Sequence, residues 1–183
     1  MNNKTFRYAM TALLAALTCV ATYFIHIPVP MVNGYANLGD AVILLFAFLF
    51  PSSPMMFAAG IGAALADAIS GYGIYIPATF VIKVGVFAIA MLLGKRGGWM
   101  RVLAAVAAEL FMVLGYLVFE MWIVDMGAGA VASIPGNLVQ AGVSAVVALV
   151  VAPVMLRSSG IRKYVNKFNH NCVSSYYNMR RYG

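Results

Sequence analysis

Residues 77–93 read PATFVIKVGVFAIAMLL, and this stretch decides the class of fold to which the chain belongs. A single ionisable residue, Lys83, interrupts an otherwise apolar run. At about 1.5 Å per residue, a helix of this length extends for roughly 25 Å, close to the thickness of the hydrocarbon core of a bilayer. The stretch therefore predicts a helix that crosses a membrane.

Five more apolar segments extend this pattern in both directions along the chain. They cover residues 8–25, 38–51, 54–69, 99–124 and 134–156, with prolines or glycines at the joints. The segment that ends at Pro51 is short unless its helix begins upstream. The sequence predicts an all-α, polytopic membrane protein, a compact bundle of six transmembrane helices (1–156) followed by a basic polar cytoplasmic tail (157–183).

The composition excludes a soluble protein. Of the 183 residues, 63% are hydrophobic and 9% are charged, and the mean hydropathy is +0.91. Soluble domains are about half apolar and about a quarter charged, and a small domain cannot hide such a surplus from water. The net charge of +7 does not indicate a nucleic-acid partner. The basic residues gather at the chain ends and at one joint, not among aromatic residues on an exposed face.

Lys and Arg residues also predict the orientation of the chain. All of them except Lys83 lie before the first segment, at the joint between the fourth and fifth, or after the sixth. Since positive residues stay on the cytoplasmic side, both termini are predicted to be cytoplasmic. The alternative is a cleaved signal peptide at the start, but the apolar run continues past its Ala-rich core without a small-x-small pattern. The tail is predicted to be a partly disordered anchor to anionic lipid.

Polar residues gather in the half of the predicted bundle that faces outwards. An ionisable residue inside a span is costly, so each one requires a partner or a function. Lys83 lies about 9 Å beyond Pro77 along its helix, and its candidate partners are Asp67, Glu120 or a ligand. We predict a binding pocket formed by Asn33, Tyr35, Asn37, Asp40, Asp67, Tyr72, Tyr75, Lys83, Glu120, Asn137 and Gln140.

Each of these residues also has a purely structural explanation. A carboxylate paired with Lys83 would fix the packing of the bundle, and Asp40 would serve as an N-cap or first-turn acid. The aromatic residues would form an interfacial belt. Packing alone gives no reason to concentrate polarity at one depth, which favours the pocket. Glu109 is predicted to lie in the inner half, three turns before Glu120 on nearly the same helix face.

The chain shows no catalytic constellation. It contains no H-E-x-x-H, G-x-S-x-G or Walker A motif, and His26 and His170 fall on opposite sides of the predicted bilayer. We therefore predict no catalytic residue, no metal site and no cofactor, and the chain is not expected to be an enzyme.

Small residues form a stripe on the first predicted helix. Ala12 and Ala16 give an A-x-x-x-A pattern, which lets the backbone of another helix approach closely. The third segment has a similar face around Gly60 and Ala64. Such stripes are common in alanine-rich membrane helices, so each alone is a weak signal.

Four blocks of sequence together point to a family. They are YANLGD at 35–40, GIGAALAD at 60–67, GY at 71–72 and YIPATFVIKVG at 75–85. These blocks resemble the substrate-binding S components of energy-coupling factor (ECF) vitamin transporters, over about a third of the chain. The NLGD sequence resembles the subgroup for hydroxymethylpyrimidine, pyridoxine and related small heteroaromatic vitamins. The embedded lysine and carboxylates suit a small polar ring with amine or hydroxyl groups.

The resemblance implies a function and a set of partners. Such a subunit sits in the bacterial plasma membrane as a multi-pass protein, and residues 1–156 would form its substrate-binding domain. It captures a vitamin at the outer face, docks on a membrane T component carried by two ABC-type ATPases, and topples in the lipid bilayer to release its cargo. The docking face maps onto Ala12 and Ala16. Two alternatives are a stand-alone secondary transporter or facilitator and a structural membrane subunit without a ligand.

Overall fold

The structure, a computed structural model, describes residues 3–28, 35–95 and 97–179. Its elements are α1 (Asn3–Phe24), β1 (His26–Pro28), β2 (Tyr35–Asn37), α2 (Gly39–Leu49), α3 (Ser53–Ser70), η1 (Gly73–Tyr75), α4 (Ile76–Gly94), α5 (Trp99–Trp122), η2 (Gly127–Ser133), α6 (Ile134–Arg157) and α7 (Ser159–Met179). The predicted helical architecture is confirmed. The sequence did not predict the short antiparallel ribbon of β1 and β2, in which His26 pairs with Asn37.

Five helices in the described part of the chain are long and apolar enough to cross a membrane, namely α1, α3, α4, α5 and α6. Their outer faces carry large apolar side chains such as Val81, Val118 and Val146, each more than half exposed. Exposed apolar surface of this extent is unfavourable in water but suits a surrounding of lipid. The chain is a multi-pass membrane protein.

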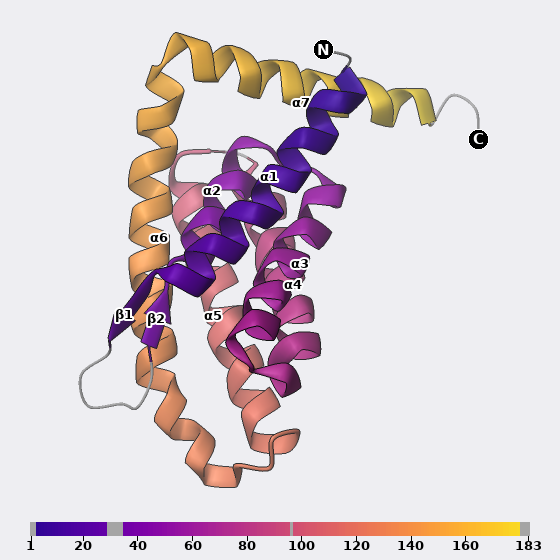
Figure 1. Ribbon diagram of the computed structural model, residues 1–183. Helices are drawn as coiled ribbons and strands as arrows, with labels where there is room; N and C mark the ends of the chain where they lie inside the picture. Colours follow the sequence, from indigo (N-terminus) through magenta and orange to yellow (C-terminus); the bar gives the residue numbers. More distant parts are fainter. Residues whose placement is uncertain (1–2, 29–34, 96, 180–183) are drawn as a thin grey trace.

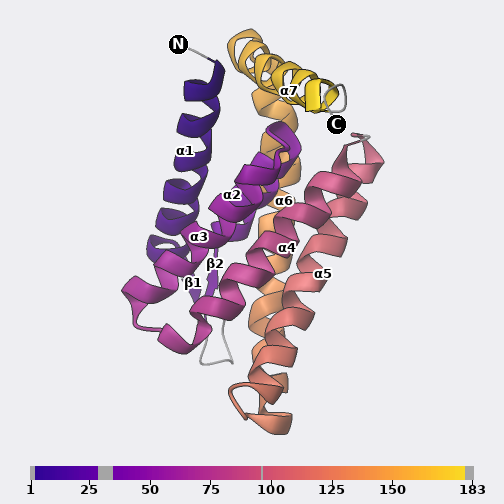
Figure 2. The ribbon, with the colours of Figure 1, turned by 90° about the vertical axis from the view of Figure 1, so that its right-hand side faces the viewer.

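The helices α1, α3, α4 and α5 form a row in which each one packs on the next (Figure 2). The helices α2 and α6 pack on each other and cover one side of this row, since α2 contacts α1 and α4 while α6 contacts α5 (Figure 1). The two ends of the chain lie at the same end of the bundle (Figure 1). Which side of the membrane this end faces stays a prediction.

The second predicted span differs from the others. Helix α2 has 11 residues and extends for only about 16 Å, which is too short to cross a bilayer. The ribbon leads the chain into the bundle before α2 begins at Gly39. Nine residues of α2 are buried, including Asp40 in its first turn, which explains why the helix is apolar on all sides. Asp40 therefore lies inside the bundle, in the first turn of α2, as its structural explanation predicted.

Within the predicted tail, Ser159–Met179 form a helix, α7, which the sequence analysis did not predict. Every third or fourth residue at its start is apolar, and this face packs on the end of the bundle, with Val165 and Phe168 buried. The Phe168 ring meets the rings of Phe50 and Phe6 edge-on at 5.3 and 6.4 Å. Helix α7 thus lies across the end of the bundle at which α1 begins (Figure 1).

A glycine brings α1 and α3 into backbone contact. A Cβ atom on Gly62 of α3 would lie 2.4 Å from the carbonyl oxygen of Ala15 on α1. Close packing of this kind is how small residues stabilise pairs of helices in membranes, because lipid offers helices no hydrophobic force towards each other. The small-residue face predicted around Gly60 packs on α4 instead, since a Cβ atom on Gly60 would lie 2.8 Å from the carbonyl oxygen of Phe80.

We expect Gly62→Ala to lower the midpoint of thermal unfolding in detergent. The added methyl group meets backbone atoms that cannot rotate away, and overpacking of this kind costs about 1–3 kcal/mol. The matched control is Gly142→Ala on α6, where nothing lies within 4 Å of the added Cβ. That change should leave the midpoint unchanged or raise it, since alanine favours a helix over glycine by about 1 kcal/mol. Equal midpoints for the two variants would contradict the close α1–α3 contact.

Candidate binding site

Polar side chains from three helices converge on the start of α2. Tyr75, at the end of η1, precedes Thr79 and Lys83 on α4, and the three are spaced four residues apart, which places them along one side of this stretch. Glu109, Tyr116 and Glu120 share a face of α5, and Asn137, Gln140 and Ser144 share a face of α6. The contacts α2–α4, α2–α6 and α4–α5 bring these faces together.

An ion pair forms the centre of the site. The Nζ atom of Lys83 lies 2.7 Å from Oδ2 of Asp40, and the two side chains are 3% and 0% exposed. The ammonium group also lies 5.2 Å from the centre of the Tyr116 ring, a cation–π distance. The named candidate partners of Lys83 were Asp67, Glu120 or a ligand, but the carboxylate in contact with it is that of Asp40. The late start of α2 carries Asp40 to the depth of Lys83.

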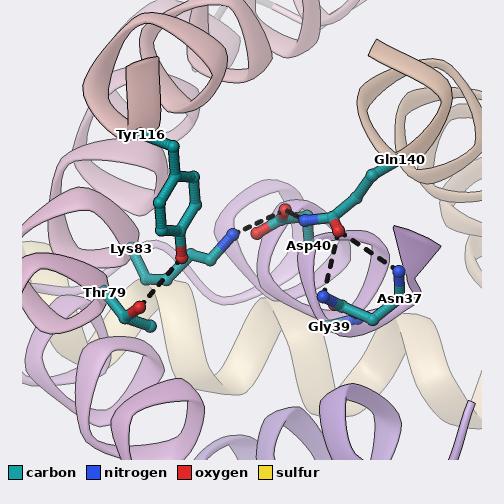
Figure 3. A network of polar contacts seen from close by, with 7 residues as sticks. All are labelled: Asn37, Gly39, Asp40, Thr79, Lys83, Tyr116 and Gln140. Atoms are coloured by element: carbon teal, nitrogen blue, oxygen red, sulfur yellow. Dashed lines mark hydrogen bonds and ion pairs between the residues drawn. The ribbon is translucent and has the colours of Figure 1, made fainter. Parts of the chain in front are cut away.

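Gln140 extends the ion pair into a hydrogen-bonded network (Figure 3). Its Nε2 donates to Oδ2 of Asp40 at 2.6 Å. Its Oε1 accepts from the backbone N–H of Asn37 at 3.2 Å and from Nδ2 of the same residue at 3.0 Å. The Oδ1 atom of Asn37 accepts in turn from the N–H of Gly39 at 3.0 Å, at the entry to α2. The network therefore joins the ribbon, α2, α4 and α6.

A second polar cluster surrounds Glu120. Its carboxylate accepts hydrogen bonds from the hydroxyl groups of Ser133 and, at 3.4 Å, of Tyr75. The Tyr75 ring packs on Phe119 at 5.3 Å and on Tyr72 at 6.2 Å. Since Tyr75 and Glu120 lie one helical turn from Thr79 and Tyr116 respectively, this cluster adjoins the central network.

The link between the two clusters is a pair of hydroxyl groups. The Thr79 Oγ1 and Tyr116 OH atoms lie 3.0 Å apart, next to Lys83 (Figure 3). Neither residue was predicted to belong to the site, and neither was Ser133. Helical spacing could have found the first two, because Thr79 lies four residues before Lys83, and Tyr116 lies four residues before Glu120.

The remaining predicted residues are either half-buried, exposed or outside the described part of the chain. Asp67 is half-buried near the end of α3, where it interacts electrostatically with Lys83. Asn137 is half-buried on α6, one turn from Gln140, and Tyr72 is exposed. Tyr35 belongs to β2, but its side chain lies outside the described part, as does the whole of Asn33. Ala12 and Ala16 are exposed on α1, on a face that no other described element covers.

The site offers both charges of an ion pair, an amide and several hydroxyl groups within an apolar bundle. Binding sites for small molecules have this composition, a mostly apolar lining with a few convergent polar groups that fix orientation. Among the described residues, no group of three or more His, Cys, Asp or Glu side chains is placed to hold a metal ion. The arrangement is suited to hydrogen bonding with a small polar molecule.

Comparison with known proteins identifies a family and a similar protein. Residues 2–157 match the family described as ECF-type riboflavin transporter, S component, which covers nearly the whole bundle. A Pyrococcus woesei protein, described as an uncharacterized protein in the gap 3′ region, is 39% identical over 124 residues. These residues make up 67% of this chain and 82% of that protein. The family is one of transporter subunits, and its match extends from the first helix to the end of α6.

We expect Lys83→Met to lower the thermal midpoint, because it leaves the Asp40 carboxylate buried without a counter-charge. Breaking a buried ion pair from one side costs about 3–5 kcal/mol. The double variant Asp40→Asn/Lys83→Met should recover most of the loss, since it removes both charges and keeps an acceptor for Gln140. Lys95→Met, at an exposed lysine, is the control and should change the midpoint little. A double variant no more stable than Lys83→Met would show that the pair does not account for the loss.

Proposed function

Because this chain belongs to the family of ECF-type riboflavin transporter S components, we propose that it is the high-affinity vitamin-binding membrane subunit of an ECF-type ABC importer. The subunit captures its vitamin at the outer face of the bacterial plasma membrane. It then delivers the vitamin through a membrane T component and two ABC-type ATPase subunits. Both termini face the cytoplasm in this proposal, which puts α7 at the inner surface, as the distribution of Lys and Arg favours.

The observation that carries the proposal is the network around Asp40 and Lys83. Ionisable side chains this deep in a membrane bundle mark functional sites by default, because they are costly to keep there. Here they are joined by Gln140 and Asn37, next to the ribbon that leads into the bundle. We propose that the ligand is held by the predicted residues Asn33, Tyr35, Asn37, Asp40, Asp67, Tyr72, Tyr75, Lys83, Glu120, Asn137 and Gln140.

The chemistry of these residues supports a small ligand. The ammonium of Lys83 and the amide of Gln140 donate, the carboxylates accept, and Tyr75 and Tyr116 supply aromatic faces. A small heteroaromatic ring with amine or hydroxyl groups, of the hydroxymethylpyrimidine or pyridoxine class, could satisfy these groups together. Riboflavin, named in the description of the family, is the competing ligand, and the two are separated by experiment.

The docking surface in this proposal is the exposed face of α1. Ala12 and Ala16 leave a shallow strip between larger exposed side chains such as Leu13 and Leu17. Helices in membranes associate through such strips, because small residues let two backbones approach. The T component would pack on this strip, on the side of α1 opposite to the residues buried against the bundle, such as Leu14 and Thr18.

Purified protein should retain its vitamin, or bind it when it is added, with a dissociation constant between nanomolar and micromolar and without ATPase activity. Mass spectrometry of small molecules released from the purified protein identifies the ligand, and titration with hydroxymethylpyrimidine, pyridoxine and riboflavin ranks them. The Asp40→Asn/Lys83→Met variant should bind the vitamin about tenfold or more weakly while remaining folded. Concentrative uptake by the isolated protein would argue for a secondary transporter, and tightest binding of riboflavin would refute the substrate class.

Replacement of Ala12 or Ala16 by Trp should abolish docking but preserve the ligand site. The added bulk stands where backbones must approach, so uptake by the complete complex should fall while ligand affinity of the isolated subunit stays unchanged. The matched control is Val146→Trp on α6, at a side chain that is 61% exposed to the surroundings of the bundle. Uptake that survives both changes equally would show that the α1 strip faces lipid.

A further inference from the structure

Glu109 is a buried carboxyl group that the network does not use. Its side chain is 3% exposed on α5, between the fully buried Ala108 and Met112. Neither carboxylate oxygen has a hydrogen-bond partner among the described residues. Buried polar groups almost always have partners, so each exception requires an explanation. Packing does not supply one here, because an apolar side chain of the same size would fill the space at lower cost.

The position of Glu109 connects it to the site. It lies seven residues before Tyr116 on the same face of α5, and the Tyr116 ring lies against the Lys83 ammonium group. Glu109 interacts electrostatically with both Lys83 and Asp40. Lys83, the cation with which Glu109 interacts, is already in direct contact with Asp40.

Asp40 contributes a further free acceptor. Its Oδ2 atom receives both Lys83 and Gln140, whereas Oδ1 is buried and has no partner among the described residues. Together, Asp40 and Glu109 thus present three carboxylate oxygens that lack donors among the described residues. When both are ionised, these two carboxylates carry one negative charge more than Lys83 neutralises. A ligand that satisfies this side of the site must bring N–H donors and positive charge.

We propose that Glu109 and the free oxygen of Asp40 form an anionic subsite that binds the amino group and protonated ring nitrogen of an aminopyrimidine-type ligand. This inference rests on the proposed function and selects within its substrate class. An amino group supplies two N–H donors, and protonation of the ring supplies another together with a delocalised positive charge. Hydrogen bonds between charged partners are about twice as strong as neutral ones. A ring with hydroxyl or carbonyl groups at the same positions leaves Glu109 unpaired.

The test compares two rings on two proteins by isothermal titration calorimetry. The rings are 4-amino-5-hydroxymethyl-2-methylpyrimidine and its 4-oxo analogue, which differ in the group offered to Glu109. Wild-type protein should bind the amino ring about tenfold to a hundredfold more tightly. Glu109→Gln keeps the shape of the side chain but removes its charge, and it should bind the two rings within about twofold of each other. Asp125→Asn, at an exposed carboxylate beyond α5, should keep the wild-type preference.

Each other outcome has a distinct meaning. If wild-type protein binds both rings equally, or if Glu109→Gln weakens both by the same factor, the subsite is refuted while the proposed function stands. If wild-type protein binds neither ring, nor pyridoxine, nor riboflavin, the proposed function fails as well. Should Glu109→Gln fail to fold, Glu109→Met removes the charge without leaving a buried amide, and the same comparison of the two rings applies to it.

Discussion

Lys83 and Asp40 lie in contact inside a bundle whose outer surface is apolar, where water does not compete for either charge. Each is tolerable only because the other is there, since an isolated charge in such a place would cost several kcal/mol. The pair constrains the fold as well as the site. It requires the first turn of α2 to lie beside the second turn of α4. Gln140 then fixes α6 against the same carboxylate, so one ion pair sets the relative positions of three helices.

Hydropathy predicted most of this architecture because it measures apolar character, and a helix surrounded by lipid must be apolar. The first, third, fourth, fifth and sixth predicted segments correspond to α1, α3, α4, α5 and α6. Residues 38–51 were interpreted incorrectly as a span, since an apolar composition indicates that a helix is buried but not whether protein or lipid surrounds it. A helix enclosed by protein and a helix enclosed by lipid are equally apolar, and length is what separates them. The ribbon before α2 left no signal, because three-residue strands are too short to show a period.

The sequence predicted several of the residues that meet at the site better than it predicted which of them are in contact. Asn37, Asp40, Lys83 and Gln140 do meet. The carboxylates named as candidate partners of Lys83 lie on the third and fifth segments, whereas the carboxylate in contact with it lies in the first turn of α2. Thr79 and Tyr116 were missed because a hydroxyl group in an apolar helix is ordinary. Only their spacing from Lys83 and Glu120 distinguishes them, and spacing gains meaning once the neighbouring helix is known.

The contact of Gly62 with Ala15 also bears on how the bundle moves. Two helices separated by layers of flexible side chains can slide, since each rotamer change absorbs part of a displacement. Helices α1 and α3 have no such layer where their backbones touch. We therefore expect α1 and α3 to move together where their backbones touch, because no layer of side chains lies between them there.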